Sequence, residues 1–292
     1  MPTTRMAATR GPIRAWIFDW DGIFVDSERW KAWTYGLGLC DVYPEFASLA
    51  ASRFDPQQPQ PGDPFLQACG RYVGKSREEY ARGVVAYYDA LGYRLSARLA
   101  EVRADWTAAA PDRIQQIVLE RRKTGVPVNA PVEPWEVLFE LRRPYYQRYQ
   151  DNVEPIVDNV QFLTTLPDNV PVGLVTRTPE DRVRALMERF AIPVSRFRKL
   201  ACVPQKDVSK ARMYEDTASA LGISLDQCAA VEDTETGVAD ARRAGAEQGK
   251  RVGLIVACPT PMTAVQEFGA ADLIVHGGLR KLRTLAAALG EK

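Results

Sequence analysis

The C-terminal half of the chain alternates between short apolar runs and segments with helical periodicity. The apolar runs predict strands at 172–176, 200–203, 228–232, 252–257 and 272–275. The segments between and after them predict helices at 180–190, 209–222, 237–244, 261–268 and 279–288. This alternation indicates an α/β fold, in which a parallel sheet is covered by helices on both faces. A further apolar run at 14–20 predicts a buried strand that joins the same sheet.

The pattern between residues 27 and 155 is helical instead. It predicts helices near 27–38, 77–92, 95–108, 111–122 and 133–149. Two loops interrupt it, at 54–64 and 124–134, and the first holds four prolines, which a helix interior does not tolerate.

We therefore expect a helical domain inserted into an α/β core. Residues 1–10 are expected to form a disordered tail, 11–27 and 156–292 the core domain, and 28–155 the inserted domain.

Composition limits the possible functions. The 292 residues are 46% hydrophobic and 26% charged, with a net charge of +1, so no global field favours nucleic acid or a membrane. No apolar run approaches the ~18 residues that span a bilayer, and the first ten residues lack the apolar core of a secretory signal. The five cysteines form no C-x-x-C pair, which favours a reducing, cytoplasmic setting. Because His276 is the only histidine, a histidine-based zinc site or a Ser-His-Asp triad is not expected.

The first candidate site is Asp19-Trp20-Asp21-Gly22, directly after the predicted strand at 14–20. In extended backbone, residues i and i+2 point the same way, so both carboxylates can meet one ligand. Gly22 permits a tight turn behind them. The carboxyl ends of strands in open α/β sheets are where active sites lie. The alternative interpretation is a strand followed by a solvated acidic turn.

Three further segments lie at predicted strand ends or helix starts. Thr176 ends one strand, Lys210 begins a helix, and Glu232-Asp233 ends another strand. Taken singly, each has a purely structural interpretation. Thr176 could cap a helix, Lys210 could be a surface lysine, and Glu232-Asp233 could belong to a capping cluster. Their joint occurrence at one edge of the sheet favours a catalytic site.

With these four motifs the chain resembles the haloacid dehalogenase-like (HAD) hydrolase superfamily. The stretch from Asp19 to Glu28 is similar to its phosphoglycolate phosphatase and β-phosphoglucomutase branch, as are Glu232-Asp233-Thr234, Gly237 and Ala244-Gly245. The resemblance covers 14–30 and 171–280. It implies a Rossmann-like core, with the helical insertion in the position of the branch's cap domain.

The resemblance also implies residue roles and a Mg²⁺ cofactor. Asp19 is the expected nucleophile, which forms an aspartyl-phosphate, and Asp21 the expected acid and base. Thr176 is expected to hold the phosphoryl oxygens, and Lys210 to neutralise charge. Mg²⁺ would be bound by the Asp19 carboxylate, the Asp21 carbonyl and Asp233, with Glu232 as a direct or indirect ligand.

Some details depart from the family pattern. Lys210 is not followed by the common Pro-x-Pro, and Lys206 competes for its role, although the spacing favours Lys210. Arg177 follows Thr176 in place of the commoner Asn or Gly and is a candidate phosphate contact, as is the turn at Gly22.

In the insertion, the segment from Gly74 to Glu79 resembles a loop with which relatives reach substrate. Lys75 and Arg77 are therefore candidates for binding a second anionic group of the substrate. The alternative interpretation, that both residues belong to a solvated helix start, stays open. We interpret Trp30, Trp33, Trp106 and Trp135 as core residues of the insertion.

The leading hypothesis is a Mg²⁺-dependent phosphatase of a small phosphorylated metabolite. A sugar-phosphate mutase of the same branch would use the same aspartyl-phosphate and stays open. A dehalogenase is less favoured because such enzymes usually lack the second aspartate, and a phosphonatase requires a Schiff-base lysine, for which Lys75 is available. A non-catalytic binding module is disfavoured by the joint presence of Asp19, Asp21, Lys210 and Asp233.

Overall fold

The chain divides into two compact units in the computed structural model. One unit holds the residues up to Ser27 together with those from Val153, and the other is Glu28–Asn152. The structure describes residues 12–40, 43, 64–124, 126–202 and 208–282. The expected N-terminal tail, residues 54–63 of the first predicted loop, Lys206 and residues 283–288 of the last predicted helix lie outside the described residues.

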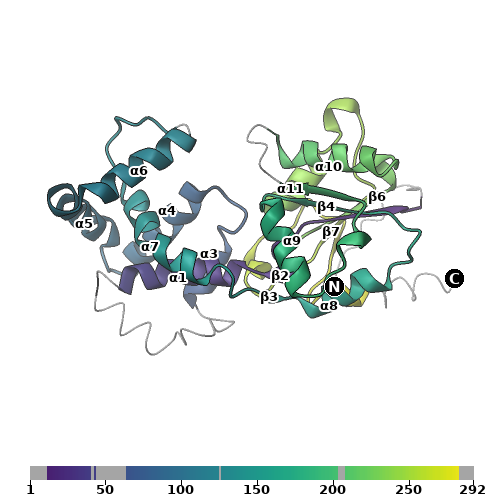
Figure 1. Cartoon of the computed structure of the whole chain (residues 1–292), viewed down its shortest axis with the longest axis horizontal. Coiled ribbons are helices and arrows are strands. Elements are labelled where there is room, and N and C mark those ends of the chain that lie inside the picture. The colour runs from purple at the N-terminus through teal and green to yellow at the C-terminus, as the bar shows by residue number, and fades with distance from the viewer. Residues whose placement is uncertain (1–11, 41–42, 44–63, 125, 203–207, 283–292) are drawn as a thin grey trace. The chain divides into compact units, whose positions relative to one another are not determined.

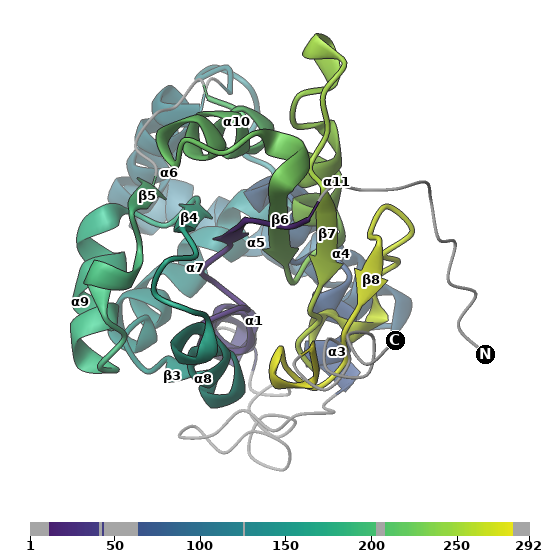
Figure 2. The ribbon, with the colours of Figure 1, turned by 90° about the vertical axis from the view of Figure 1, so that its right-hand side faces the viewer.

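A six-stranded parallel sheet forms the centre of the first unit. Its strands in chain order are β1 Ala15–Phe18, β4 Val172–Thr176, β5 Lys199–Cys202, β6 Cys228–Glu232, β7 Leu254–Ala257 and β8 Leu273–Ile274. The order across the sheet is β5-β4-β1-β6-β7-β8, and every pairing is parallel (Figure 2). The prediction of a parallel sheet that includes the first strand is confirmed.

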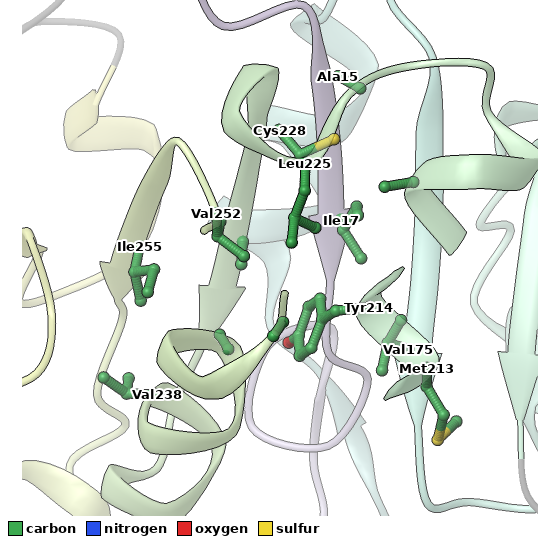
Figure 3. Close-up of a cluster of buried hydrophobic side chains, with 14 of the residues drawn as sticks. Ala15, Ile17, Val175, Met213, Tyr214, Leu225, Cys228, Val238, Val252 and Ile255 are labelled. Atoms are coloured by element: carbon green, nitrogen blue, oxygen red, sulfur yellow. The ribbon is translucent and has the colours of Figure 1, made fainter. Parts of the chain in front are cut away.

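Helices cover both faces of this sheet. They are α8 Val157–Thr165, α9 Glu180–Arg189, α10 Lys210–Ala220 and α11 Glu235–Arg243 (Figure 1). Side chains alternate along β1, so Ala15 and Ile17 enter the core beneath α10 and α11 (Figure 3). Trp16 and Phe18 point to the opposite face, where their rings lie 5.3 and 6.4 Å from the ring of Phe162 in α8. Because β1 lies between β4 and β6, the residues that follow it lie near the middle of the carboxyl edge of the sheet.

A short antiparallel pair joins two distant parts of this unit. Strand β2, Val25–Asp26, pairs with β3, Glu154–Pro155. The Ile156 amide also donates to the Phe24 carbonyl at 2.9 Å. The segments on either side of the insertion are therefore held together within the first unit.

The prediction of a helix at 261–268 is wrong. Only one short 3-10 turn, Thr263–Val265, forms there. The Thr260 amide donates to the Thr263 hydroxyl at 2.9 Å, and the Thr263 amide donates to the Thr260 hydroxyl at 3.2 Å. These side chains satisfy the backbone locally and so compete with a helix.

Helix α8 was not predicted. Further 3-10 turns lie at Val194–Arg196, Leu225–Gln227 and Ala246–Gln248.

The second unit is a bundle of helices. They are α1 Glu28–Cys40, α3 Pro64–Gly70, α4 Arg77–Ala90, α5 Leu95–Ala109, α6 Pro111–Thr124 and α7 Pro134–Tyr149 (Figure 1). Helix α7 packs against α1, α4, α5 and α6. Ser76 begins α4 with a capping box, in which its side chain and that of Glu79 each accept from the other's amide. No helix among the described residues is long and apolar enough to cross a membrane.

Candidate active site

The two aspartates of the first motif lie where β1 ends. The Asp19 amide donates to the Val231 carbonyl at 3.0 Å, which extends the pairing of β1 with β6 by one residue. A turn follows, in which Gly22 has a φ of +75° and its amide donates to the Val25 carbonyl at 2.8 Å. Asp19 is 8% exposed, so its carboxylate lies largely out of bulk water.

Three carboxylates gather at this end of the sheet. Oxygens of Asp19, Glu232 and Asp233 lie within 4.8 Å of one another. The cause is the sheet register: Phe18 pairs with Val231, so the residues that end β1 and β6 are neighbours. All three are buried. Like charges at this spacing repel one another, which favours a bound cation or a proton on one of the carboxyl groups.

Lys210 supplies one positive charge. Helix α10 begins at this residue, after Ser209, whose side chain accepts from the Arg212 amide. The Lys210 ammonium nitrogen lies 2.9 Å from an Asp19 oxygen and 2.7 Å from a Glu232 oxygen. Burial lowers the pKa of Lys210, but the charges of Asp19 and Glu232 outweigh it and raise the pKa above its ordinary value. Lys210 is therefore an ammonium between two carboxylates.

Glu232 uses one oxygen for two protein donors. Its Oε1 accepts from Lys210 and from the hydroxyl of Tyr214, which lies one turn further along α10. Its Oε2 is buried and has no hydrogen-bond partner among the described residues. Burial and the charge of Asp19 raise the pKa of Glu232 above its ordinary range, while Lys210 opposes the rise.

Two glycines leave the cluster open. A Cβ at Gly22 would lie 1.9 Å from Oδ2 of Asp233, and a Cβ at Gly237 would lie 2.0 Å from Oε2 of Glu232. The donors here are carboxylate oxygens, which Mg²⁺ prefers over nitrogen or sulfur. An unpartnered carboxylate oxygen beside two further acids thus fits a hard divalent cation.

Asp21 is held by two hydroxyl groups. Ser27 donates to its Oδ1, and Thr178 donates to its Oδ2. The Thr178 amide donates to the Thr176 hydroxyl at 3.1 Å, so the loop after β4 connects Thr176 to Asp21. This network orients Asp21 at the same end of the sheet as Asp19.

Among the described residues, the remaining candidates make no hydrogen bond or ion pair with these carboxylates. Arg177 is exposed, and its guanidinium lies 3.7 Å from Asp240 in α11. Lys75 and Arg77 belong to the helical unit, where Lys75 is exposed and Arg77 pairs with Glu120 at 3.1 Å. Lys206, the alternative lysine, is not among the described residues.

Sequence reasoning did not assign a role to Ser27, Thr178 or Tyr214. Tyr214 had a usable signal, because it follows Lys210 by four residues and so shares its helix face. Thr178 follows Thr176 by two residues, but whether its hydroxyl reaches Asp21 depends on the fold of a loop.

The family model for haloacid dehalogenase-like hydrolases matches residues 13–245. The chain belongs to this hydrolase family. No curated protein matches it.

Solved structures share the fold at low identity. A predicted phosphoglycolate phosphatase from Haemophilus somnus 129PT is 15% identical, with a TM-score of 0.54 over 94% of this chain and 98% of the other. A predicted phosphatase from Clostridium acetobutylicum is 14% identical, with a TM-score of 0.51 over 95% and 100%. A β-phosphoglucomutase candidate from Thermotoga maritima is 13% identical, with a TM-score of 0.50 over 94% and 99%.

Proposed function

We propose that this hydrolase is a Mg²⁺-dependent phosphatase that cleaves a small phosphorylated metabolite through an aspartyl-phosphate. The observation that carries the proposal is the contact between Asp19 and the Lys210 ammonium, 2.9 Å apart, beside the carboxylates of Glu232 and Asp233. A carboxylate nucleophile requires such charge compensation, because a phosphate ester is itself anionic and would otherwise be repelled.

Asp19 attacks phosphorus, and the bond from phosphorus to the ester oxygen breaks. Asp21 gives a proton to the departing oxygen and later takes one from the water that hydrolyses the aspartyl-phosphate. The hydroxyls of Ser27 and Thr178 orient the Asp21 carboxylate for both steps. Lys210 balances the charge that Asp19 brings to the phosphate, and the Thr176 hydroxyl with nearby amides holds phosphoryl oxygens.

Asp19, Asp233 and the Asp21 carbonyl are the residues that would hold Mg²⁺, with Glu232 beside them. Bound Mg²⁺ neutralises part of the phosphate charge and orients the ester. The unpartnered Glu232 oxygen and the space at Gly22 and Gly237 support this assignment.

The test is phosphate release from an aryl phosphate and a panel of metabolite phosphates. The wild type should release phosphate with Mg²⁺ and not with EDTA, and Asp19→Asn should release none. Folding of the variant is checked by thermal unfolding. Metal-independent release, or release by Asp19→Asn, would contradict the proposal.

The sugar-phosphate mutase is separated from the phosphatase by the same panel. A mutase would convert a sugar monophosphate into its isomer and would require a sugar bisphosphate activator. Release of inorganic phosphate without any activator is the result expected for the phosphatase.

A further inference from the structure

The buried side chain of Asn159 joins three segments at the carboxyl end of the sheet. Asn159 is 1% exposed and lies in the first turn of α8. Its Nδ2 donates to the Ile23 carbonyl at 2.7 Å, and its Oδ1 accepts from the Leu279 amide at 2.7 Å. The same nitrogen lies 3.9 Å from Sγ of Cys258. All four residues belong to the first unit, so one side chain connects α8 with the turn after β1 and with the segments that follow β7 and β8.

The two backbone partners of Asn159 make opposite demands. A carbonyl oxygen can only accept, and an amide N–H can only donate, so the group between them must donate at one end and accept at the other. A neutral carboxamide does both at once. Ile23 and Leu279 are fully buried, so an apolar side chain in place of Asn159 would deprive a buried acceptor and a buried donor of this partner. Asn159 therefore does more than fill space in the core.

The Ile23 carbonyl belongs to the tight turn that follows β1. Inside the turn, the amides of Ile23 and Phe24 donate to the Trp20 carbonyl at 3.3 and 2.9 Å. Outside it, the start of α8 holds both carbonyls, because Asn159 Nδ2 donates to Ile23 and the Ile156 amide donates to Phe24. Of these four hydrogen bonds, Asn159 supplies the one that comes from a side chain.

The geometry of this turn decides where the groups of Asp21 point. A trans peptide group is planar, with its N–H and its C=O on opposite sides. Because the Gly22 amide donates to the Val25 carbonyl at 2.8 Å, the Asp21 carbonyl of the same peptide group points away from Val25. A shift of the backbone at Ile23, two residues later, would turn both this carbonyl and the Asp21 carboxylate.

We propose that Asn159 is a positioning residue, which holds the turn after β1 and with it the carbonyl and the carboxylate of Asp21 in the geometry that the reaction requires. It acts through the Ile23 carbonyl and not on the substrate. Groups that orient metal ligands in this way change metal affinity or activity by about 10–100-fold when they are mutated. The inference rests on the proposed function, because it takes Asp21 as a Mg²⁺ ligand through its carbonyl and as the acid and base.

Asn159→Leu tests the proposal, because it removes both hydrogen bonds at a similar side-chain size. We expect the Mg²⁺ Kd, measured by isothermal titration calorimetry, to rise about tenfold. The second readout is kcat/KM for two kinds of ester, since an alkyl phosphate has a more basic leaving oxygen than 4-nitrophenyl phosphate and needs more help from an acid. We expect kcat/KM for the best alkyl phosphate of the panel to fall about tenfold further than kcat/KM for 4-nitrophenyl phosphate.

A merely structural role would move neither readout. A smaller folded fraction lowers kcat/KM equally for both esters and leaves the Mg²⁺ Kd of the folded molecules unchanged. Thr165→Val is the matched control in α8, because it removes a hydroxyl that donates to the Phe162 carbonyl at 2.8 Å, and it should keep both readouts at the wild-type values. If thermal unfolding shows that Asn159→Leu does not fold, Asn159→Ala is measured in its place, with the same expectation.

The failure of this inference differs from the failure of the proposed function. An unchanged Mg²⁺ Kd in the folded variant, or an equal loss of kcat/KM for both esters, would overturn the role of Asn159 and leave the phosphatase standing. Absence of Mg²⁺-dependent phosphate release by the wild type would overturn the proposed function and the role of Asn159 with it.

Discussion

The ammonium nitrogen of Lys210 lies 2.9 Å from Oδ2 of Asp19, although the two residues are 191 positions apart in the sequence. The contact forms because α10 begins at Lys210 and packs over β1 and β4. Lys210 also touches Glu232, so one buried cation serves two carboxylates.

Removing this cation should stop catalysis. Lys210→Met is expected to reduce kcat by about a hundredfold or more, because the charge of Asp19 then opposes the incoming phosphate. The variant should also unfold more easily without Mg²⁺, since two buried carboxylates lose their partner. Steady-state phosphate release and thermal unfolding measure both effects.

Lys206→Met is the matched control, because Lys206 is the alternative active-site lysine. It should retain the activity of the wild type. Full activity in Lys210→Met with loss in Lys206→Met would reverse the assignment of the two lysines.

A side chain at Gly22 should close the space that we propose for Mg²⁺. The Cβ of Gly22→Ala would lie 1.9 Å from Oδ2 of Asp233 at a φ of +75°. We expect loss of phosphate release and of Mg²⁺ binding, measured by isothermal titration calorimetry.

Gly222→Ala separates this clash from backbone strain. Gly222 has a φ of +68°, and nothing lies within 4 Å of its added Cβ. It should cost about 1–2 kcal/mol of unfolding free energy and leave the specific activity intact. Equal Mg²⁺ affinities in the two variants would show that the space at Gly22 is not used.

Tyr214 should act through Glu232. Tyr214→Phe keeps the buried ring but removes the hydroxyl that donates to Glu232 Oε1. Residues that orient metal ligands typically change metal affinity by about tenfold or more when mutated. We expect the Mg²⁺ Kd to rise by about that factor, while kcat at saturating Mg²⁺ changes little.

Tyr87→Phe, in α4 of the helical unit, controls for the loss of a hydroxyl elsewhere. It should leave the Mg²⁺ Kd unchanged. A Tyr214→Phe variant with unaltered Mg²⁺ affinity but lower unfolding free energy would mark Tyr214 as purely structural.

The sheet was predictable because its strands are short apolar runs separated by helical segments, and β1 is recognised by the same pattern as β4 and β6. The carboxyl ends of these strands then bring Asp19, Thr176 and Glu232 to one edge. The insertion was predictable as helical, since it has few β-branched runs and its loop at 124–134 carries prolines.

Other features depend on side-chain contacts that no local pattern encodes. The turn at Thr263–Val265 replaces a predicted helix because two threonine side chains satisfy the backbone. The hydroxyls of Ser27 and Thr178 reach Asp21 only through tertiary packing. Trp135 is a large aromatic residue of the kind that packs in a core, and only the packing of α4, α6 and α7 leaves it on the lining of a cavity.

The thiol of Cys228 gives a stability prediction at high pH. Burial, and secondarily the charge of Asp226, raises its pKa from the reference value of 9.0 to about 12. The thiol ionises at a lower pH in the unfolded chain than in the folded protein. The stabilisation that the buried, neutral thiol gives to the folded protein is therefore fully present below about pH 9 and is lost as pH rises toward 12. Each pH unit in that window should cost about 1.4 kcal/mol of unfolding free energy.

Cys228→Ala removes this contribution. The slope of unfolding free energy against pH, from denaturant titrations between about pH 9 and 11, should be shallower in the variant by that amount. Below about pH 9 the two slopes should agree. Identical slopes throughout would mean that the thiol ionises equally in both states.

The most direct test of the account is whether Asp19 becomes phosphorylated. Asp21→Asn is incubated with acetyl phosphate and Mg²⁺, quenched in acid and digested, and the modified residue is located by mass spectrometry. Acetyl phosphate needs little acid assistance, whereas hydrolysis of the aspartyl-phosphate needs the Asp21 base, so the intermediate should accumulate. We predict one phosphoryl group on Asp19 that is absent with EDTA. Phosphate release by the wild type without a phosphorylated Asp19 in this variant, or phosphate on another residue, would contradict the account.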